Sequence, residues 1–398
     1  MINQRIRQAR TVSGLSQDAV VRALSDRGVT LTKAALSKYE RGASAPRATL
    51  LKHLGAVLSV QPEYFLREPT VTVEWLAFRK RAAVGAREQE RFQTLALERV
   101  EAYVRLLEGL SVDSVPPFPA REPVATFDDA ERAAESLRRT WKLDDMPVES
   151  MTEMIESHEG IVVELAGAED AMDGMAGLAN GCHAVVVVDP GVSDDRKRFT
   201  LAHELGHLVM DTSDAASPKD EERLAHRFAS AFLVPATVAR KELGTKRAHL
   251  TLDELMILKE KHGLSMQAWL YRARDSGIID VQHFNALFDR LTRQGWRRTE
   301  PVEYRGRERP TRFRQMVLRA LAEGILDQNQ ARTWCPELEF SFPAPVSDGM
   351  TATMFRKLPP EQRDVLLARA AEGMVDAYMN NPTLGGFEAF DEAEGEQP

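Results

Sequence analysis

The stretch RKRFTLAHELGHLVMD, residues 196–211, places His203 and His207 four residues apart with Glu204 between them. The leucines around these residues predict a helix whose apolar side packs into a protein core. Residues four apart lie on the same face of an α-helix, one turn from each other. We therefore expect His203 and His207 to direct both imidazole rings toward one point.

Two imidazoles held one helical turn apart are suited to binding a metal ion. Neutral imidazole is a good zinc ligand, with a bond of about 2.0–2.1 Å. Zinc would lower the pKa of a water molecule, and Glu204, one residue after the first ligand, would take the proton. The motif therefore predicts a zinc site, with manganese as the alternative metal, in which Glu204 is the catalytic acid and base.

A catalytic zinc site keeps three protein ligands and one open position, so a third ligand is needed from another element. A second helix is predicted in EERLAHRFASAFLVP, residues 221–235, and Glu222 is its preferred ligand. The less favoured alternatives are Glu221, His226, Asp211 and Asp214.

Two β-branched runs before the motif, GIVVELAG at residues 160–167 and CHAVVVVDP at residues 182–190, predict strands. Cys182 begins the second run. A thiolate is a strong zinc ligand, so Cys182 could take the open position and hold the enzyme latent; the alternative is a small buried strand residue.

Length and composition indicate a soluble globular protein of two or three domains. The chain has 398 residues and two cysteines, too few for a disulfide scaffold. Its N-terminus lacks the apolar core of a signal peptide, and no run approaches the roughly 18 apolar residues of a membrane span. We expect a cytoplasmic protein with no membrane partner.

The charge is concentrated unevenly along the chain. Residues 1–68 contain 11 Lys+Arg against 5 Asp+Glu, a net charge of +6, whereas the whole chain carries −8. A basic N-terminal region, here called the head (residues 1–68), on an otherwise acidic chain suggests that the head binds a polyanion. Ser16 and Thr32 are predicted N-caps of two short helices there, and glycines follow both helices.

Changes in amino-acid composition mark two further regions of the chain, a linker and a C-terminal region. Residues 69–123 are predicted to be a helical linker that ends in a Pro-rich segment, and residues 284–398 a helical or mixed C-terminal region with a disordered acidic tail. Arginines with Trp296 and Tyr304 in residues 291–330 suit single-stranded nucleic acid, or alternatively brace the neighbouring domain. We interpret this region as a possible sensor.

The two helices of the central region resemble those of the ImmA/IrrE-type zinc metallopeptidases. That family shows RFTxAHELGH and then ExxAxxFAxxLLMP; here the second pattern ends in FLVP. The resemblance covers residues 124–283 and implies a zincin-like, gluzincin-like domain with His203, His207 and Glu222 as ligands and Glu204 as catalytic residue. Tyr271 and Arg272 would polarise the scissile carbonyl or steady the oxyanion, unless they only pack on a helix surface.

Residues 1–68 resemble the XRE/lambda-repressor-like helix-turn-helix domains. In that fold the second helix meets the phosphate backbone and the third enters the major groove of operator DNA. The residues expected to contact DNA are Gln17, Thr32, Lys33, Ala34, Ser37, Lys38 and Arg41. Such domains usually pair, so a homodimer is expected; a helix-turn-helix used only for protein contact is the alternative.

Together these features predict an α+β, mostly helical chain that joins a DNA-binding head to a zinc endopeptidase. The resemblance implies regulated cleavage of a repressor, often a small helix-turn-helix protein, in a stress, DNA-damage or phage-defence response, with single-stranded DNA as a plausible activator. The alternative is a transcriptional regulator or antitoxin whose peptidase fold senses or binds without cutting.

Overall fold

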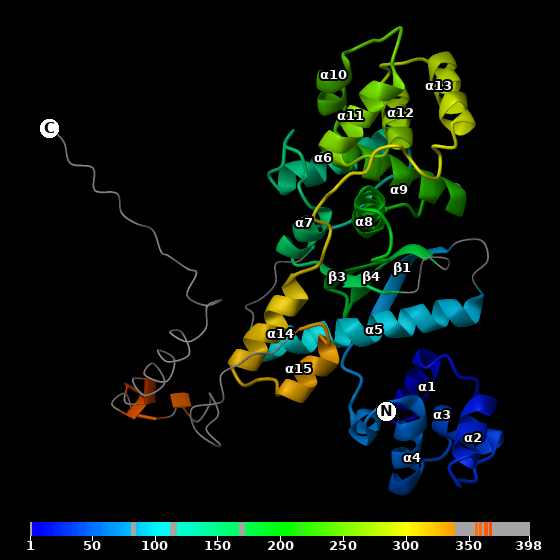
Figure 1. Cartoon of the computed structure of the whole chain (residues 1–398), viewed down its shortest axis with the longest axis vertical. Coiled ribbons are helices and arrows are strands. Elements are labelled where there is room, and N and C mark those ends of the chain that lie inside the picture. The colour runs from blue at the N-terminus through cyan, green and yellow to red at the C-terminus, as the bar shows by residue number, and fades with distance from the viewer. Residues whose placement is uncertain are drawn as a thin grey trace, which may run out of the picture. The chain divides into compact units, whose positions relative to one another are not determined.

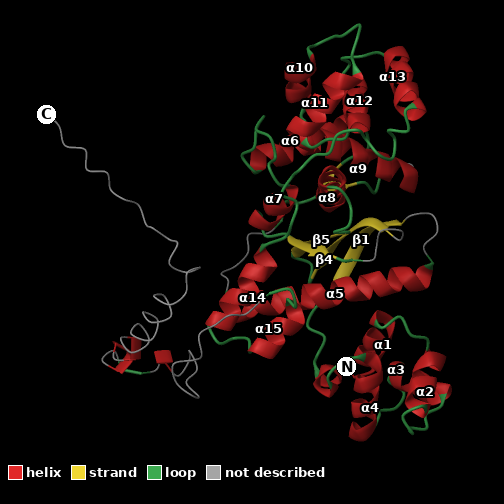
Figure 2. Cartoon of the chain, viewed as in Figure 1, coloured by secondary structure: helices red, strands yellow, loops and turns green. Residues whose placement is uncertain are grey.

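The computed structural model describes residues 2–80, 85–111, 118–166, 172–215 and 217–338, with short pieces between 355 and 367. The chain divides into two compact units, residues 1–313 and 314–398. Helices predominate over strands, as Figures 1 and 2 show, so the mostly helical α+β class is confirmed. The predicted disordered tail lies outside the described residues.

The chain begins with a bundle of short helices around its own apolar core. The elements are α1 (Ile2–Val12), α2 (Gln17–Ser25), α3 (Lys33–Glu40), α4 (Ala48–Leu58) and a 3₁₀ turn η1 (Pro62–Leu66). Ser16 and Thr32 accept hydrogen bonds from the backbone N–H groups of Ala19 and Ala35, as N-caps do. Buried Ile6, Leu36 and other apolar side chains fill the centre.

A long helix, α5 (Ala86–Gly109), packs against this bundle through a buried ion pair. The Arg5 guanidinium donates to both carboxylate oxygens of Glu101, and its side chain is 2% exposed. The backbone carbonyls of Arg67 and Glu68 accept from the same guanidinium, so its charge is fully partnered. The first helix is thereby fixed to α5.

A four-stranded sheet lies between α5 and the helix that carries the histidines, α8 (Asp194–Val209) (Figures 1 and 2). Its strands are β1 (Val73–Lys80), β3 (Ile161–Glu164), β4 (Met172–Ala179) and β5 (His183–Val188), in the order β1-β4-β5-β3. β3 is parallel to β5, and the other two pairings are antiparallel. Burial on both faces explains the nearly continuous valine run of β5.

The prediction that residues 69–123 form a helical linker is wrong at the start of that range. Val73–Lys80 forms β1, which pairs with β4 at the edge of the sheet. VEWLAFRK alternates polar and apolar residues at its beginning, a period that suits a strand. The predicted linker therefore contributes a strand to the sheet beneath α8.

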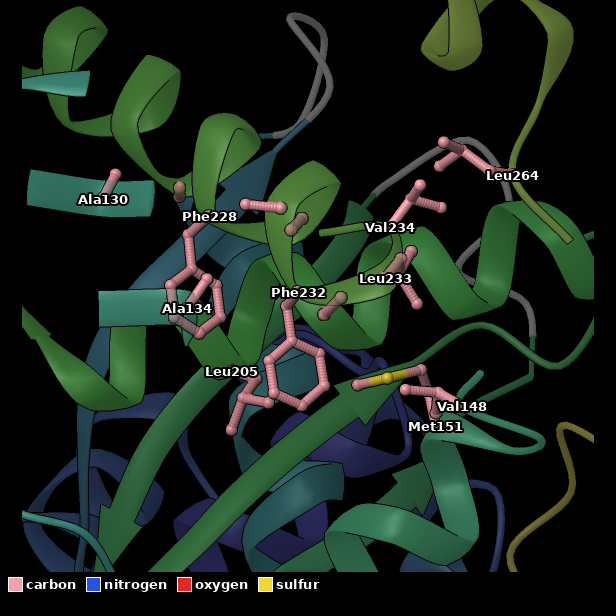
Figure 3. Close-up of a cluster of buried hydrophobic side chains, with 14 of the residues drawn as sticks. Ala130, Ala134, Val148, Met151, Leu205, Phe228, Phe232, Leu233, Val234 and Leu264 are labelled. Carbon is pink, nitrogen blue, oxygen red and sulfur yellow. The ribbon is translucent and has the colours of Figure 1, made fainter. Parts of the chain in front are cut away.

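The remaining helices of the first unit pack on α8 or on one another. They are α6 (Phe127–Thr140), α7 (Met151–Ser157), α9 (Pro218–Leu233), α10 (Ala236–Leu243), α11 (Leu252–His262), α12 (Met266–Asp275) and α13 (Val281–Arg293), with a small parallel pair of β2 (Glu122–Pro123) and β6 (Met210–Asp211). Figure 3 shows Phe228 and Phe232 projecting from α9 into the shared core, near Leu205 of α8.

An extended segment, residues 300–308, crosses the first turns of α8 and is here named the strap. Its Glu308 is fully buried, caps α7 by accepting from the N–H groups of Met151 and Thr152, and pairs with Arg198 of α8 at 2.9 Å. At the other end of the strap, Glu300 pairs with Lys259 at 2.9 Å. The strap therefore holds α7, α8 and α11 together.

Glu156, at the end of α7, introduces a pH dependence into stability. Burial raises its pKa to about 7, although backbone N–H groups of Thr311 and Arg312 bind the carboxylate. The folded state then binds the proton more tightly than the unfolded state, so this contribution is present below about pH 4.5 and is lost as pH rises toward 7.

As the pH rises from about 4.5 to about 7, we expect the free energy of unfolding of the wild type to fall, relative to that of Glu156→Gln, by up to about 3 kcal/mol. Urea unfolding of both proteins at pH 5 and pH 7.5 measures the difference. Parallel stability profiles of the two proteins across this range would contradict the assignment.

The second unit includes most of α14 (Arg312–Ala322) and all of α15 (Gln328–Trp334). Val317, Ala320, Ala331 and Cys335 are buried in it. Among the described helices, none has the length and apolar character needed to cross a membrane.

Candidate metal centre

Helix α8 is held deep in the first unit. Leu201, Leu205 and Leu208 face the core, and His203 and Glu204 have no exposed surface. His207 is 4% exposed. A helix buried on nearly all sides keeps its side chains in fixed positions, as a preorganised site requires.

Three potential ligand atoms converge beside α8. The Nε2 atoms of His203 and His207 lie 3.2 Å apart. Glu222, from α9, places one carboxylate oxygen 3.4 Å from the first nitrogen and the other 3.7 Å from the second. These three residues are the group in the described chain whose donor atoms gather closely enough for one ion.

The spacing of these donors fits a tetrahedral zinc ion. Ligand bonds of about 2.0–2.1 Å at tetrahedral angles place neighbouring donor atoms roughly 3.3 Å apart. The two imidazoles and one carboxylate match the ligand types of catalytic zinc sites, which leave the fourth position open. Glu222, the preferred third ligand, is thus the candidate that the structure brings to both histidines.

Glu221 was considered as a ligand but occupies a different position. Its carboxylate oxygen lies 3.7 Å from Nδ1 of His207, on the ring side away from the other donors, and accepts a hydrogen bond from Thr212 at 3.0 Å. The contact with His207 lowers the pKa of Glu221. A carboxylate at Nδ1 favours the tautomer with a bare Nε2, the form that binds metal.

The carboxylates around His207 also change its pKa. Burial alone would lower the pKa of His207, but the adjacent Glu221 carboxylate, together with Glu204 and Glu222, raises it above its ordinary value. A metal ion must displace the proton that this environment favours. We therefore expect metal binding to weaken as the solution becomes more acidic.

We expect Glu221→Ala to weaken zinc binding about 10- to 100-fold, because His207 loses the carboxylate that orients it. Competition with a chromophoric chelator measures the dissociation constant. Glu260→Ala, which removes an exposed glutamate of α11, serves as the control and should bind zinc like the wild type. Unchanged affinity in Glu221→Ala would refute the orienting role.

Glu204 lies beside the three donors and directly under β4. A Cβ atom at Gly174 would stand 2.5 Å from Oε1 of Glu204 and 2.8 Å from Thr200 Cγ2. Only glycine lets the strand pass this close. Gly174 was not among the predicted site residues, because nothing in MDGMAGLA indicates which of its two glycines meets the helix.

His226, another rejected ligand, lies at the border of a cavity. Its ring is 4.7 Å from that of His203 and 5.6 Å from that of Phe199. The cavity has a volume of approximately 640 Å³, and its wall includes His226 and Tyr271 but none of the three metal-donor residues. The structure therefore brings Tyr271 to a cavity next to the donors rather than among them.

Arg272 does not face the donors, which corrects the expectation that it stabilises an oxyanion. Its side chain is fully buried, donates to the Val234 carbonyl at 2.6 Å and pairs with Glu131 at 3.0 Å. A guanidinium already bound on both sides holds α12 to α9 and α6. Its role is structural.

Cys182 is also placed away from the donors. It lies in the exposed turn between β4 and β5, whereas Gly174, which touches Glu204, is at the opposite end of β4. The intervening residues span roughly 17 Å at strand spacing. The expectation that Cys182 could occupy the open metal position is therefore wrong. Asp211 and Asp214 also lie outside the donor group found in the described chain.

The residues expected to contact DNA lie on and around α3. Thr32, Lys33, Ala34, Lys38 and Arg41 are exposed, and Ser37 is half-buried. Gln17 donates to Glu40 at 2.9 Å instead of pointing freely to solvent. The outer face of α3 is thus exposed, although Gln17 would need to exchange its bond to Glu40, and Lys33 its ion pair with Asp18 at 2.7 Å, for a new partner.

The aromatics of the arginine-rich segment are not free stacking platforms. Trp296 packs against the main core, and Tyr304 lies against Arg198 and Gly263. Arg297, Arg305 and neighbouring arginines remain exposed. The rings of Trp296 and Tyr304 are therefore not free to stack on the bases of single-stranded DNA. Binding of single-stranded DNA by this segment stays a prediction.

Comparison with known proteins adds one finding. Residues 157–274 match the family model of the IrrE N-terminal-like domain, peptidase family M78. No curated protein and no solved structure matches the chain. The matched segment contains the three donors and Glu204, and it indicates a metallopeptidase-related role for this part of the chain.

Proposed function

From this match and the donor geometry, we propose that the protein is a zinc-dependent endopeptidase that cleaves a repressor-type protein. The observation that carries the proposal is the convergence of the two imidazole Nε2 atoms, 3.2 Å apart, on the Glu222 carboxylate, whose two oxygens lie 3.4 Å from His203 Nε2 and 3.7 Å from His207 Nε2, with Glu204 alongside. Manganese is the alternative metal, because imidazole and carboxylate donors also bind it.

A bound zinc ion would supply a Lewis acid that polarises a peptide carbonyl and makes a water molecule more acidic. Glu204 accepts a proton from the water whose oxygen attacks the carbonyl carbon. As the C–N bond breaks, Glu204 delivers that proton to the departing amide nitrogen. The core packing of α8 keeps the Glu204 carboxylate at the reacting atoms throughout.

Residues 1–68, the N-terminal helical bundle, support the DNA-binding part of the proposal. A net charge of +6 in residues 1–68 and the exposed outer face of α3 favour binding of double-stranded operator DNA. A DNA-binding peptidase meets its repressor substrate at the operator. We propose regulated, site-specific proteolysis in the cytoplasm during a stress or phage-defence response, by a chain that pairs on its operator.

The proposal is tested with the purified full chain and a small helix-turn-helix repressor encoded beside it. The metal-free chain, the zinc-loaded chain and the manganese-loaded chain are each incubated with the repressor, with and without single-stranded DNA. We expect a single cut that requires metal. Operator binding without cleavage in every condition would instead select the non-proteolytic regulator.

A further inference from the structure

The cavity behind His226 opens next to the metal donors. Phe199 comes from α8 and His226 from α9, and their rings stack at 5.6 Å with an angle of 26°. The cavity wall also includes Phe127, Tyr271 and Ser230. Its approximately 640 Å³ can hold a whole amino-acid side chain with its backbone.

Arginines line the part of the cavity wall formed by α9 and α12. The guanidinium of Arg227 lies 5.0 Å from the ring centre of Phe127, and that of Arg274 lies 4.9 Å from that of Tyr271. Stacking on aromatic rings holds these planar groups in fixed orientations. Their remaining N–H groups are thus presented in a defined geometry.

The ion-pair network behind this wall contains more positive than negative groups. Glu131 binds both Arg272 and Arg227, at 3.0 and 3.2 Å. Asp275 binds both Arg227 and Arg274, at 3.2 and 2.8 Å. Three guanidinium groups therefore share two carboxylates in this network, which keeps one positive charge in excess.

Arg274 is the member of this network that a ligand can reach most easily. Its side chain is 33% exposed, against 14% for Arg227 and 1% for Arg272. Arg223, which also lines the cavity, is balanced by Asp220 at 3.2 Å. The excess charge is thus available at the end of the wall where Arg274 lies.

We propose that this cavity is the subsite that receives a carboxylate-bearing residue of the peptide substrate, with Arg274 as its specificity-determining residue. The inference rests on the proposed peptidase function. The carboxylate comes from an Asp or Glu side chain or from a chain terminus, and either would neutralise the excess charge through a charge-assisted hydrogen bond. A Lys or Arg side chain would be repelled.

Binding is measured with zinc-loaded full chain carrying Glu204→Gln, so that peptides are not cut. The probes are three pools of fluorescein-labelled hexapeptides, random except at one central position. One pool has Glu there and an amidated terminus, one has Gln and an amidated terminus, and one has Gln and a free terminal carboxylate. Fluorescence anisotropy gives the affinity of each pool.

We expect one or both carboxylate pools to bind at least about threefold more tightly than the amidated Gln pool. Adding Arg274→Gln should remove this preference, and Arg274→Lys should retain part of it. Arg290→Gln, which removes an exposed arginine of α13 outside the cavity, should leave the preference intact. Equal binding of all three pools would overturn the proposal.

Incubation of the wild-type, zinc-loaded chain with the same pools separates this inference from the proposed function. A carboxylate preference in binding, with neither these peptides nor the repressor cut as read by mass spectrometry, would retain the subsite and reject the peptidase. Cuts that show no carboxylate preference at any position, and no change with Arg274→Gln, would retain the peptidase and reject the subsite.

Discussion

Replacing Glu204 by Gln is expected to lower the rate of repressor cleavage by about three orders of magnitude, as loss of a general acid–base group does. The amide has the size and shape of the carboxylate, so the fully buried position stays filled. It cannot accept the proton of the attacking water. The fold and the three metal donors should remain.

Three measurements on Glu204→Gln distinguish loss of chemistry from loss of structure. Initial cleavage rates should collapse, whereas bound zinc per chain and the thermal unfolding midpoint should match those of the wild type. Glu260→Gln, at an exposed position of α11, is the control. Cleavage at the wild-type rate by Glu204→Gln would remove Glu204 from the mechanism.

The largest effect on stability is expected for Glu308→Ala in the strap. Glu308 accepts bonds from Met151 N, Thr152 N and Arg198, at 3.1, 2.9 and 2.9 Å. Its removal leaves the Arg198 charge buried beside polar groups that have lost their acceptor. Breaking a buried ion pair on one side typically costs about 3–5 kcal/mol.

This loss corresponds to a decrease of the unfolding midpoint on the order of 10 °C. Differential scanning calorimetry of the full chain measures it. Glu303→Ala, an exposed glutamate in the same strap, should shift the midpoint by less than about 1 °C, as surface substitutions do. Similar midpoints for the two variants would show that the strap does not hold α8.

The metal donors were predictable because their arrangement is mainly local. The four-residue spacing of His203 and His207 fixes their common face before any tertiary contact forms. Glu222 was the preferred third ligand because it shares a face of the second helix with His226, four residues later, and because the resemblance to the ImmA/IrrE-type peptidases implies it. Its approach to both histidines still depended on how α9 packs on α8.

The errors came from residues whose partners are distant in sequence. For Arg272 the sequence left both an oxyanion role and plain packing open, because Glu131, its partner 141 positions earlier, cannot be inferred from local pattern. Val73–Lys80 was expected to be helical because its pairing strand, β4, lies a hundred residues later. Cys182 fell in a tight turn, and a period-two pattern does not show where a strand begins.

The strap limits how this protein can be divided. The family match ends at residue 274, yet Arg198 within it takes its counter-charge from Glu308, and Lys259 is shared between Asp195 inside the match and Glu300 beyond it. A fragment excised at the boundaries of the match would leave Arg198 without its carboxylate partner and would also lack β1 of the sheet. We therefore expect such a fragment to be less stable than the full chain.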